Sequence, residues 1–155
     1  MLTKDLMNKN VITINKKDSI ENAINLMEKN DIGMVIIIND NKDILGVLTD
    51  RDILIRTFKR NLPFTESVDS IMTTPAITID GEKTIEHAVS VMADFQIKRL
   101  VVTLNNKLAG VVSISNIVLN NDSRYLINKL IYEISIPNPQ KEKPLKYLKV
   151  EDFPL

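Results

Sequence analysis

The sequence of 155 residues contains no cysteine and a single histidine, His87. Without cysteine the chain has no disulfide scaffold, thiol catalysis, iron–sulfur cluster or Cys-ligated zinc. One histidine also excludes a metal site built from several histidines of one chain. His87 lies beside the apolar stripe of a predicted helix, so we interpret it as an exposed structural residue.

An excess of charge of either sign is absent as well. The chain has 20 Lys and Arg against 20 Asp and Glu, which argues against non-specific nucleic-acid binding but not against a local pocket for one phosphate. The longest apolar run, Met34–Ile38, is far shorter than a membrane span, and residues 1–10 lack a signal-peptide core. We therefore expect a soluble cytoplasmic protein with no membrane partner.

Aromatic residues are scarce, at 5%, and tryptophan is absent, whereas isoleucine is abundant. The core is therefore predicted to be aliphatic and β-branched, a composition that favours strands over long helices.

The chain repeats itself at a shift of 65 residues, which falls to 64 in the later part of the repeat. This length is too great for a solenoid unit and indicates two homologous halves related by a pseudo-twofold axis. The matching positions include Ile20 with Ile85, Ala23 with Ala88, Met27 with Met92, Gly46 with Gly110, and Ile53 with Ile117.

Each half has the pattern of a β-α-β-β-α unit, so the sequence predicts an α+β fold. Ser19 and Thr84 stand where helix N-caps belong, before apolar residues at helical spacing. A continuous apolar strand and a polar hairpin turn follow, and a second helix begins near Asp50 or Ser115. The predicted boundaries are 1–60 for the first repeat, 61–71 for a linker, 72–120 for the second repeat, and 121–155 for a C-terminal helix and tail.

The C-terminal part does not repeat. Residues 122–135 have apolar residues at the spacing of an amphipathic helix. Four of the six prolines lie in the last 19 residues, which predicts an extended tail, docked through residues such as Tyr147 and Phe153.

One seven-residue motif closes each β-α-β-β unit and opens the next helix. Gly46-Val-Leu-Thr-Asp-Arg-Asp52 fits the pattern Gly-apolar-x-Thr/Ser-x-x-Asp, and a related motif begins at Gly110. Because it recurs at the same place in both repeats, the chain over roughly residues 1–120 resembles a tandem pair of cystathionine β-synthase (CBS) domains. The resemblance implies a disc-like regulatory module with two clefts between the repeats, which commonly bind AMP, ADP, ATP or S-adenosylmethionine.

The motif has a chemistry of its own. Thr49 offers a hydroxyl beside the free N–H groups of a helix N-terminus, which suit a phosphate. Asp52, in the first turn, has a carboxylate that can accept hydrogen bonds from both hydroxyls of a ribose, as the equivalent residue does in the family. The resemblance implies that the other repeat completes this cleft, with backbone groups for adenine and basic residues for phosphate. These residues are Thr73, Thr74, Pro75, Ala76 and Ile77 for adenine, and Lys98 and Arg99 for phosphate.

The second cleft departs from the family pattern. The resemblance places Ser113 and Asn116 there with Val11, Ile12 and Thr13, but Asn116 stands where an Asp is expected. No basic residue occupies the place of Lys98 and Arg99. We therefore predict one competent site and one weak, empty or altered site.

Each candidate also has a purely structural interpretation. Asp52 and Thr49 could serve only the helix N-terminus, and Lys98 and Arg99 could be solvated surface residues. Three functions follow: a sensor of AMP, ADP or ATP without cofactor or catalysis, a structural or oligomerising CBS pair without ligand, and an enzyme. An enzyme is disfavoured because the sequence shows no nucleophile with a base, no metal set and no convincing acid–base pair.

S-adenosylmethionine ranks below the nucleotides because it has no phosphate for Arg99. The family also dimerises through flanking helices, so we expect a homodimer through Ile53–Phe58 and Ile117–Leu119. A stand-alone regulatory module further implies an effector protein, which the sequence does not name.

Overall fold

The computed structural model describes residues 1–120 and 124–135, which form two compact units. We call residues 11–76 unit 2; unit 1 comprises residues 1–10 together with the chain from Ile77 onward. The predicted tail at residues 136–155, with its docking residues, lies outside the described residues, as do residues 121–123.

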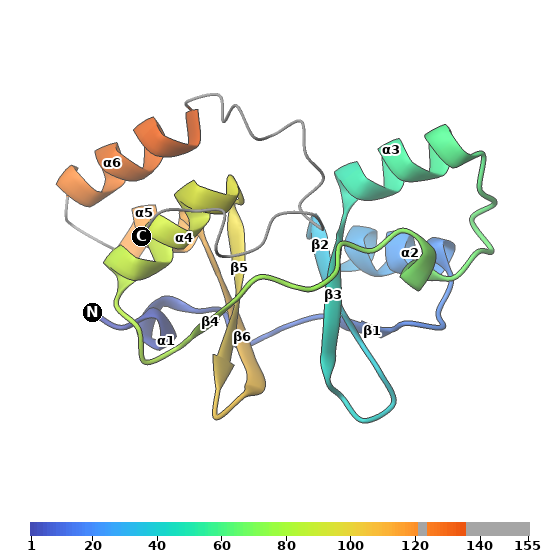
Figure 1. Cartoon of the computed structure of the whole chain (residues 1–155), viewed down its shortest axis with the longest axis horizontal. Coiled ribbons are helices and arrows are strands. Elements are labelled where there is room, and N and C mark those ends of the chain that lie inside the picture. Colours follow the sequence, from blue (N-terminus) through green and yellow to red (C-terminus); the bar gives the residue numbers. More distant parts are fainter. Residues whose placement is uncertain (121–123, 136–155) are drawn as a thin grey trace. The chain divides into compact units, whose positions relative to one another are not determined.

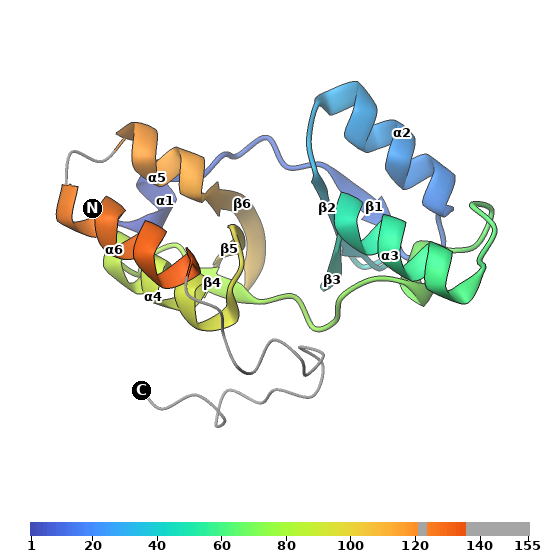
Figure 2. The same ribbon diagram turned by 90° about the horizontal axis from the view of Figure 1, so that it is seen from above.

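Unit 2 contains a three-stranded sheet of order β1-β2-β3, formed by β1 (Thr13–Asn15), β2 (Met34–Ile38) and β3 (Ile44–Thr49). β1 runs parallel to β2, and β2 pairs with β3 as an antiparallel hairpin. Helices α2 (Ile20–Asn30) and α3 (Asp50–Arg60) lie next to one another beside the sheet (Figure 1; Figure 2). A short 3-10 helix, η1 (Val68–Ser70), closes the unit.

Unit 1 repeats this plan with β4 (Thr78–Asp80), α4 (Ile85–Phe95), β5 (Arg99–Leu104), β6 (Lys107–Ser113) and α5 (Ile114–Asn120). Its sheet has the order β4-β5-β6 with the same parallel and antiparallel pairings. α1 (Thr3–Leu6) stands at the place that η1 has in unit 2, whereas α6 (Arg124–Ser135) has no counterpart among the described residues of that unit. The predicted mixed fold of two β-α-β-β-α repeats followed by a C-terminal helix is confirmed.

The helices begin where their sequences predict. Ser19 accepts a hydrogen bond from the amide of Asn22 at 3.1 Å, and Thr84 accepts one from the amide of His87 at 3.3 Å. Each of these caps satisfies one of the amides that a helix start leaves without an intrahelical partner.

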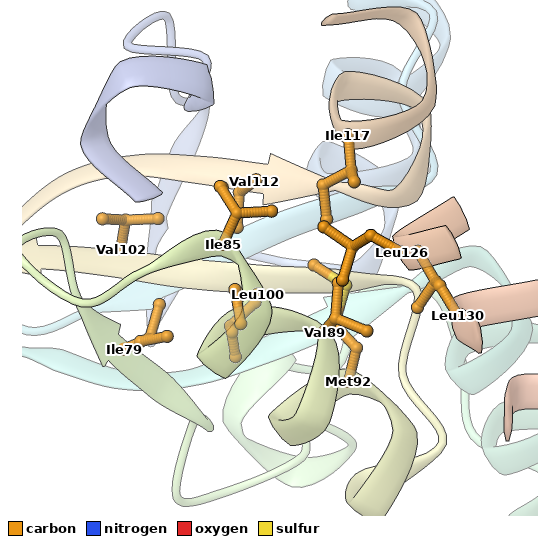
Figure 3. Close-up of a cluster of buried hydrophobic side chains, with 11 residues drawn as sticks. Ile79, Ile85, Val89, Met92, Leu100, Val102, Val112, Ile117, Leu126 and Leu130 are labelled. Atoms are coloured by element: carbon orange, nitrogen blue, oxygen red, sulfur yellow. The ribbon is translucent and has the colours of Figure 1, made fainter. Parts of the chain in front are cut away.

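Each unit has its own aliphatic core, as the scarcity of aromatic residues predicts. In unit 2 the buried side chains come from the sheet, both helices and η1: Ile14, Ile20, Ala23, Met27, Val35, Ile37, Leu48, Ile53, Val68 and Ile71. Figure 3 shows the core of unit 1, where side chains of α4, α5 and α6 meet those of the sheet. This cluster contains Ile79, Ile85, Ala88, Val89, Met92, Leu100, Val102, Val112, Ile117, Leu126 and Leu130.

The opening segment of each repeat packs against the last strand of the other. Asn8 and Val111 exchange backbone hydrogen bonds of 2.8 and 3.0 Å, and Thr73 and Val47 do the same at 2.8 and 3.0 Å. The compact units therefore divide the chain differently from the predicted boundaries. Residues 1–10 join unit 1, and the predicted linker at 61–71 packs into unit 2 through Val68 and Ile71.

Among the described residues, no helix combines the length and apolar composition that crossing a membrane requires.

Candidate functional site

Thr49 and Asp52 cap helix α3 reciprocally at the end of β3. The Thr49 hydroxyl accepts from the amide of Asp52 at 3.2 Å, and Asp52 Oδ2 accepts from the amide of Thr49 at 3.1 Å. The motif thus folds as a capping box, in which each side chain accepts a hydrogen bond from the otherwise unpaired amide of the other residue. The carboxylate is held at the N-terminus of the helix, and the Asp52 side chain is 19% exposed.

Arg56, one turn further along α3, binds the same carboxylate. Its Nη2 lies 3.1 Å from Asp52 Oδ1, and the same nitrogen donates to the Thr73 hydroxyl at 2.9 Å. Nη1 donates to the carbonyl of Ile71 at 2.5 Å. The sequence analysis missed Arg56, although an Asp and an Arg four residues apart on a helix are a recognisable pair.

Thr73 reaches the carboxylate because a second segment approaches β3 closely. A Cβ added to Gly46 would lie 2.5 Å from the carbonyl oxygen of Thr73, so a glycine is needed there. The Thr74 hydroxyl donates to the carbonyl of Leu45 at 2.7 Å, and the Thr73 hydroxyl lies 3.5 Å from Asp52 Oδ2. Unit 2 thus brings together four of the predicted site residues: Thr49, Asp52, Thr73 and Thr74. We call this cluster the Asp52 corner.

The corresponding corner of unit 1 is built without charge. Asn116 Oδ1 accepts from both the amide of Ser113, at 2.9 Å, and its hydroxyl, at 2.7 Å. Asn120 stands at the place of Arg56, and its Nδ2 donates to the backbone carbonyl of Asn116 at 2.9 Å. The capping geometry is therefore kept while the carboxylate and the guanidinium are both lost.

The other predicted residues are divided between the two units. Pro75 and Ala76 end unit 2, whereas Ile77 packs against the core of unit 1. Lys98 and Arg99 are exposed at the start of β5 in unit 1.

For the second predicted cleft, Ser113 and Asn116 belong to unit 1. Val11, Ile12 and Thr13 belong to unit 2, at the start of β1. The meeting of Asp52 with Arg99, and of Asn116 with Val11–Thr13, stays a prediction.

No group of three or more His, Cys, Asp or Glu side chains within residues 1–120 and 124–135 is arranged to hold a metal ion. The chemistry that the Asp52 corner offers is recognition: a carboxylate that accepts hydrogen bonds, beside the amide-rich start of a helix.

The chain is similar to known proteins in both sequence and fold. The model of the CBS domain matches the chain twice, at residues 4–57 and 68–120. The CBS domain-containing protein YhcV of Bacillus subtilis is 29% identical over 135 residues, which is 87% of this chain and 96% of YhcV.

Two solved structures share the fold. The CBS domain protein PAE2072 from Pyrobaculum aerophilum, complexed with AMP, has a TM-score of 0.72 at 22% identity, over 85% of this chain and 99% of its own. The CBS domain pair of protein MJ0100, in complex with 5′-methylthioadenosine and S-adenosyl-L-methionine, has a TM-score of 0.69 at 24% identity, over 77% and 94%. With both repeats matched by the family model and both folded as β-α-β-β-α units, the chain belongs to the CBS domain family.

Proposed function

We propose that this chain is a regulatory module that binds an adenine nucleotide, AMP, ADP or ATP, through the Asp52 corner and catalyses no reaction. The observation that carries the proposal is the Asp52 carboxylate, fixed at the start of α3 with Thr49 on one side and Thr73 on the other. A carboxylate in this position can accept from ribose hydroxyls, and the amides at the helix start suit a phosphate.

The fold neighbours support adenosine compounds as the ligand class. PAE2072 is complexed with AMP, and MJ0100 with 5′-methylthioadenosine and S-adenosyl-L-methionine. We rank AMP and ADP first because longer polyphosphates need more cations than the predicted pair of Lys98 and Arg99. Because Asn116 replaces the aspartate in unit 1, the proposal has one strong site per chain.

The proposed action of the ligand is a shift of population. A ligand changes the conformation of a protein only as far as it binds one conformation more tightly than the other. The closure expected from the family resemblance is such a shift. An effector protein would respond to it by binding one of the two conformations.

Calorimetric titration tests this function. AMP, ADP, ATP and S-adenosylmethionine are titrated into the wild type, Asp52→Ala and Asp50→Ala. Asp50 is the matched control, since its exposed carboxylate lies in the same helical turn and accepts from the Arg51 amide without contacting Thr73 in the described structure. We expect about one nucleotide per chain, at least about tenfold weaker binding for Asp52→Ala, and an unchanged affinity for Asp50→Ala.

Arg99→Gln in the same titration tests the predicted phosphate contact. The substitution should weaken the binding of ADP more than the binding of adenosine, because only ADP carries phosphate. An equal effect on both ligands would contradict the assignment of Arg99.

A structural CBS pair is the second candidate, and one observation favours it. The Asp52 carboxylate already has protein partners in Thr49, Arg56 and Thr73, as a side chain with a purely structural role would. If none of the four ligands binds to the folded wild type, this second function replaces the first.

We also propose that the chain forms a homodimer. Leu54 and Phe58 lie one turn apart on α3 with 70% and 86% of their surface exposed, and Leu119 on α5 is 80% exposed. Ile53 and Ile117, which the predicted faces included, are instead part of the two cores.

A further inference from the structure

Arg56 joins two parts of unit 2 that are distant in sequence. The guanidinium contacts the Asp52 carboxylate on its own helix, and it donates to Ile71 and Thr73 on the segment that follows η1. The side chain is 31% exposed, and its planar fork contacts three partners.

The contacts of Asp52 show what this fork does to the carboxylate. An ionised carboxylate has about four acceptor positions, two on each oxygen. The amide of Thr49 occupies one position on Oδ2, and Arg56 Nη2 occupies one on Oδ1, each at 3.1 Å. The third contact, from the Thr73 hydroxyl, is 3.5 Å long and lies beyond the usual range for a hydroxyl donor.

Of the two remaining acceptor positions, the one on Oδ2 has only this long contact from Thr73, and the one on Oδ1 is left for a ligand in the described structure. Thr49 and Arg56 hold the two oxygens separately, so the carboxylate cannot rotate without breaking a contact. One acceptor position on each of two fixed oxygens matches a ligand with two neighbouring hydroxyl groups.

Unit 1 supplies an internal comparison. There the single side-chain oxygen of Asn116 is used twice by Ser113. Asn120, at the place of Arg56, binds the backbone of Asn116 rather than its side chain. The arrangement that leaves a carboxylate oxygen pair available is thus specific to unit 2.

We propose that Arg56 is a positioning residue, which holds the Asp52 carboxylate in the orientation that accepts both hydroxyls of a vicinal diol and thereby selects a ribose over a deoxyribose. This inference rests on the proposed function, because it concerns the same site. Arg56 acts through Asp52 and need not touch the ligand.

Anchoring of the segment after η1 is the competing explanation for the contacts of Arg56. Arg60 provides a matched control for it. This residue lies one turn further along the same helix, and its Nη1 donates to the carbonyl of Ser70 on the same segment at 2.7 Å. In the described structure the ion-pair partner of Asp52 is Arg56 and the Arg60 guanidinium donates to Ser70, so the loss of Arg60 weakens the anchoring alone.

The test compares AMP with 2′-deoxy-AMP by calorimetry on the wild type, Arg56→Gln, Arg56→Lys and Arg60→Gln. We expect the wild type and Arg60→Gln to prefer AMP by about tenfold or more, as befits a hydrogen bond to a charged group. Arg56→Gln should reduce this preference to less than about threefold. Arg56→Lys keeps the charge without the planar fork, so its preference should fall between the two.

Circular dichroism establishes that each variant is folded, and if Arg56→Gln is not, Arg56→Lys carries the test. A preference that stays at the wild-type value in the Arg56 variants, even with both nucleotides bound more weakly, would overturn the positioning role and leave the proposed function standing. Equal binding of both nucleotides by the wild type would also overturn the positioning role and leave the proposed function standing. A preference that falls in Arg60→Gln as it does in Arg56→Gln would have the same meaning. A wild type that binds neither nucleotide would overturn the proposed function and this inference together.

Discussion

The glycines of this chain matter for their lack of a side chain rather than for an unusual backbone conformation. None of the four has a positive φ; that conformation is adopted instead by residues such as Asp31 and Asn61 at helix ends. At Gly46 and Gly110 an added Cβ would lie within 2.8 Å of a backbone carbonyl oxygen of another segment. These two glycines are therefore where the opening segment of one repeat meets the last strand of the other.

We predict that Gly46→Ala lowers the free energy of unfolding by about 1–3 kcal/mol, because the new methyl group would meet the Thr73 carbonyl at 2.5 Å and push the segment away. Urea denaturation measures the change. Gly33→Ala is the matched control: its Cβ would meet the carboxylate of Asp50 at 3.0 Å, and that exposed side chain can move. An equal loss in both variants would show that the close approach at Gly46 is not the cause.

The Asp52 corner shows how far residue patterns predict a site. Thr49 and Asp52 are predictable because a capping box has a local spacing. The partners of Arg56 are not, since Ile71 and Thr73 lie 15 and 17 residues further along the chain and no local periodicity connects them to it.

Among the helices, α6 is held to unit 1 through α4. Leu126 and Leu130 are buried in the core of the unit, and the side-chain amide of Gln96 donates to the carbonyl of Glu133 at 2.9 Å. Near this contact, partial burial raises the pKa of Asp94 above its ordinary value, and the charge of Glu133 raises it further. His87 and Lys129 act in the opposite direction.

Leu130→Ala should lower the free energy of unfolding by about 2–5 kcal/mol, because it removes a fully buried side chain between α6 and the core. Ile131→Ala is the matched control on the next residue, where 49% of the side chain is exposed. It should cost less than about 1 kcal/mol. Urea denaturation of both variants measures the difference, and similar values would mean that α6 does not pack as described.

Asp94→Asn should stabilise the fold near neutral pH. A carboxyl whose pKa is raised by folding binds its proton more tightly in the folded state, so its ionised form disfavours folding at neutral pH and this cost disappears as the pH falls. The gain should be below about 0.5 kcal/mol, since water screens an exposed carboxylate. Denaturation at pH 7 and at about pH 3, where Asp is protonated in both states, should show the gain only at pH 7. A gain that persists at the lower pH would rule out this cause.

At the scale of the whole molecule, the proposed dimer depends on α3. Sedimentation should show a wild-type dimer at micromolar concentration, and Phe58→Glu should give a monomer because it places a charge on the exposed apolar face. Phe64→Glu is the control, since Phe64 is also exposed, at 54%, but lies outside the helix. A monomeric wild type would refute the proposal, and a dimeric Phe58→Glu would remove α3 from the interface.

The order of elements was predictable from local signals, whereas the division into units was not. The strand at Met34–Ile38 and the caps at Ser19 and Thr84 have their signatures within a few residues. The bonds between Asn8 and Val111 join segments about a hundred residues apart, and a single bridged pair has no periodicity to reveal it. The repeat pattern therefore located each element, whereas the packing of the first ten residues into unit 1 had no signal in it.

The residues of unit 2 lie between two parts of unit 1 in the sequence, which fixes the order in which the two units are completed during synthesis. Every residue of unit 2 lies between positions 11 and 76, so this unit has all its parts before the rest of unit 1 is translated. Residues 1–10 are made before their partners Lys83 and Val111, which follow several seconds later at about 5–20 residues per second. During synthesis, residues 1–10 therefore stay without these partners while unit 2 already has all of its residues.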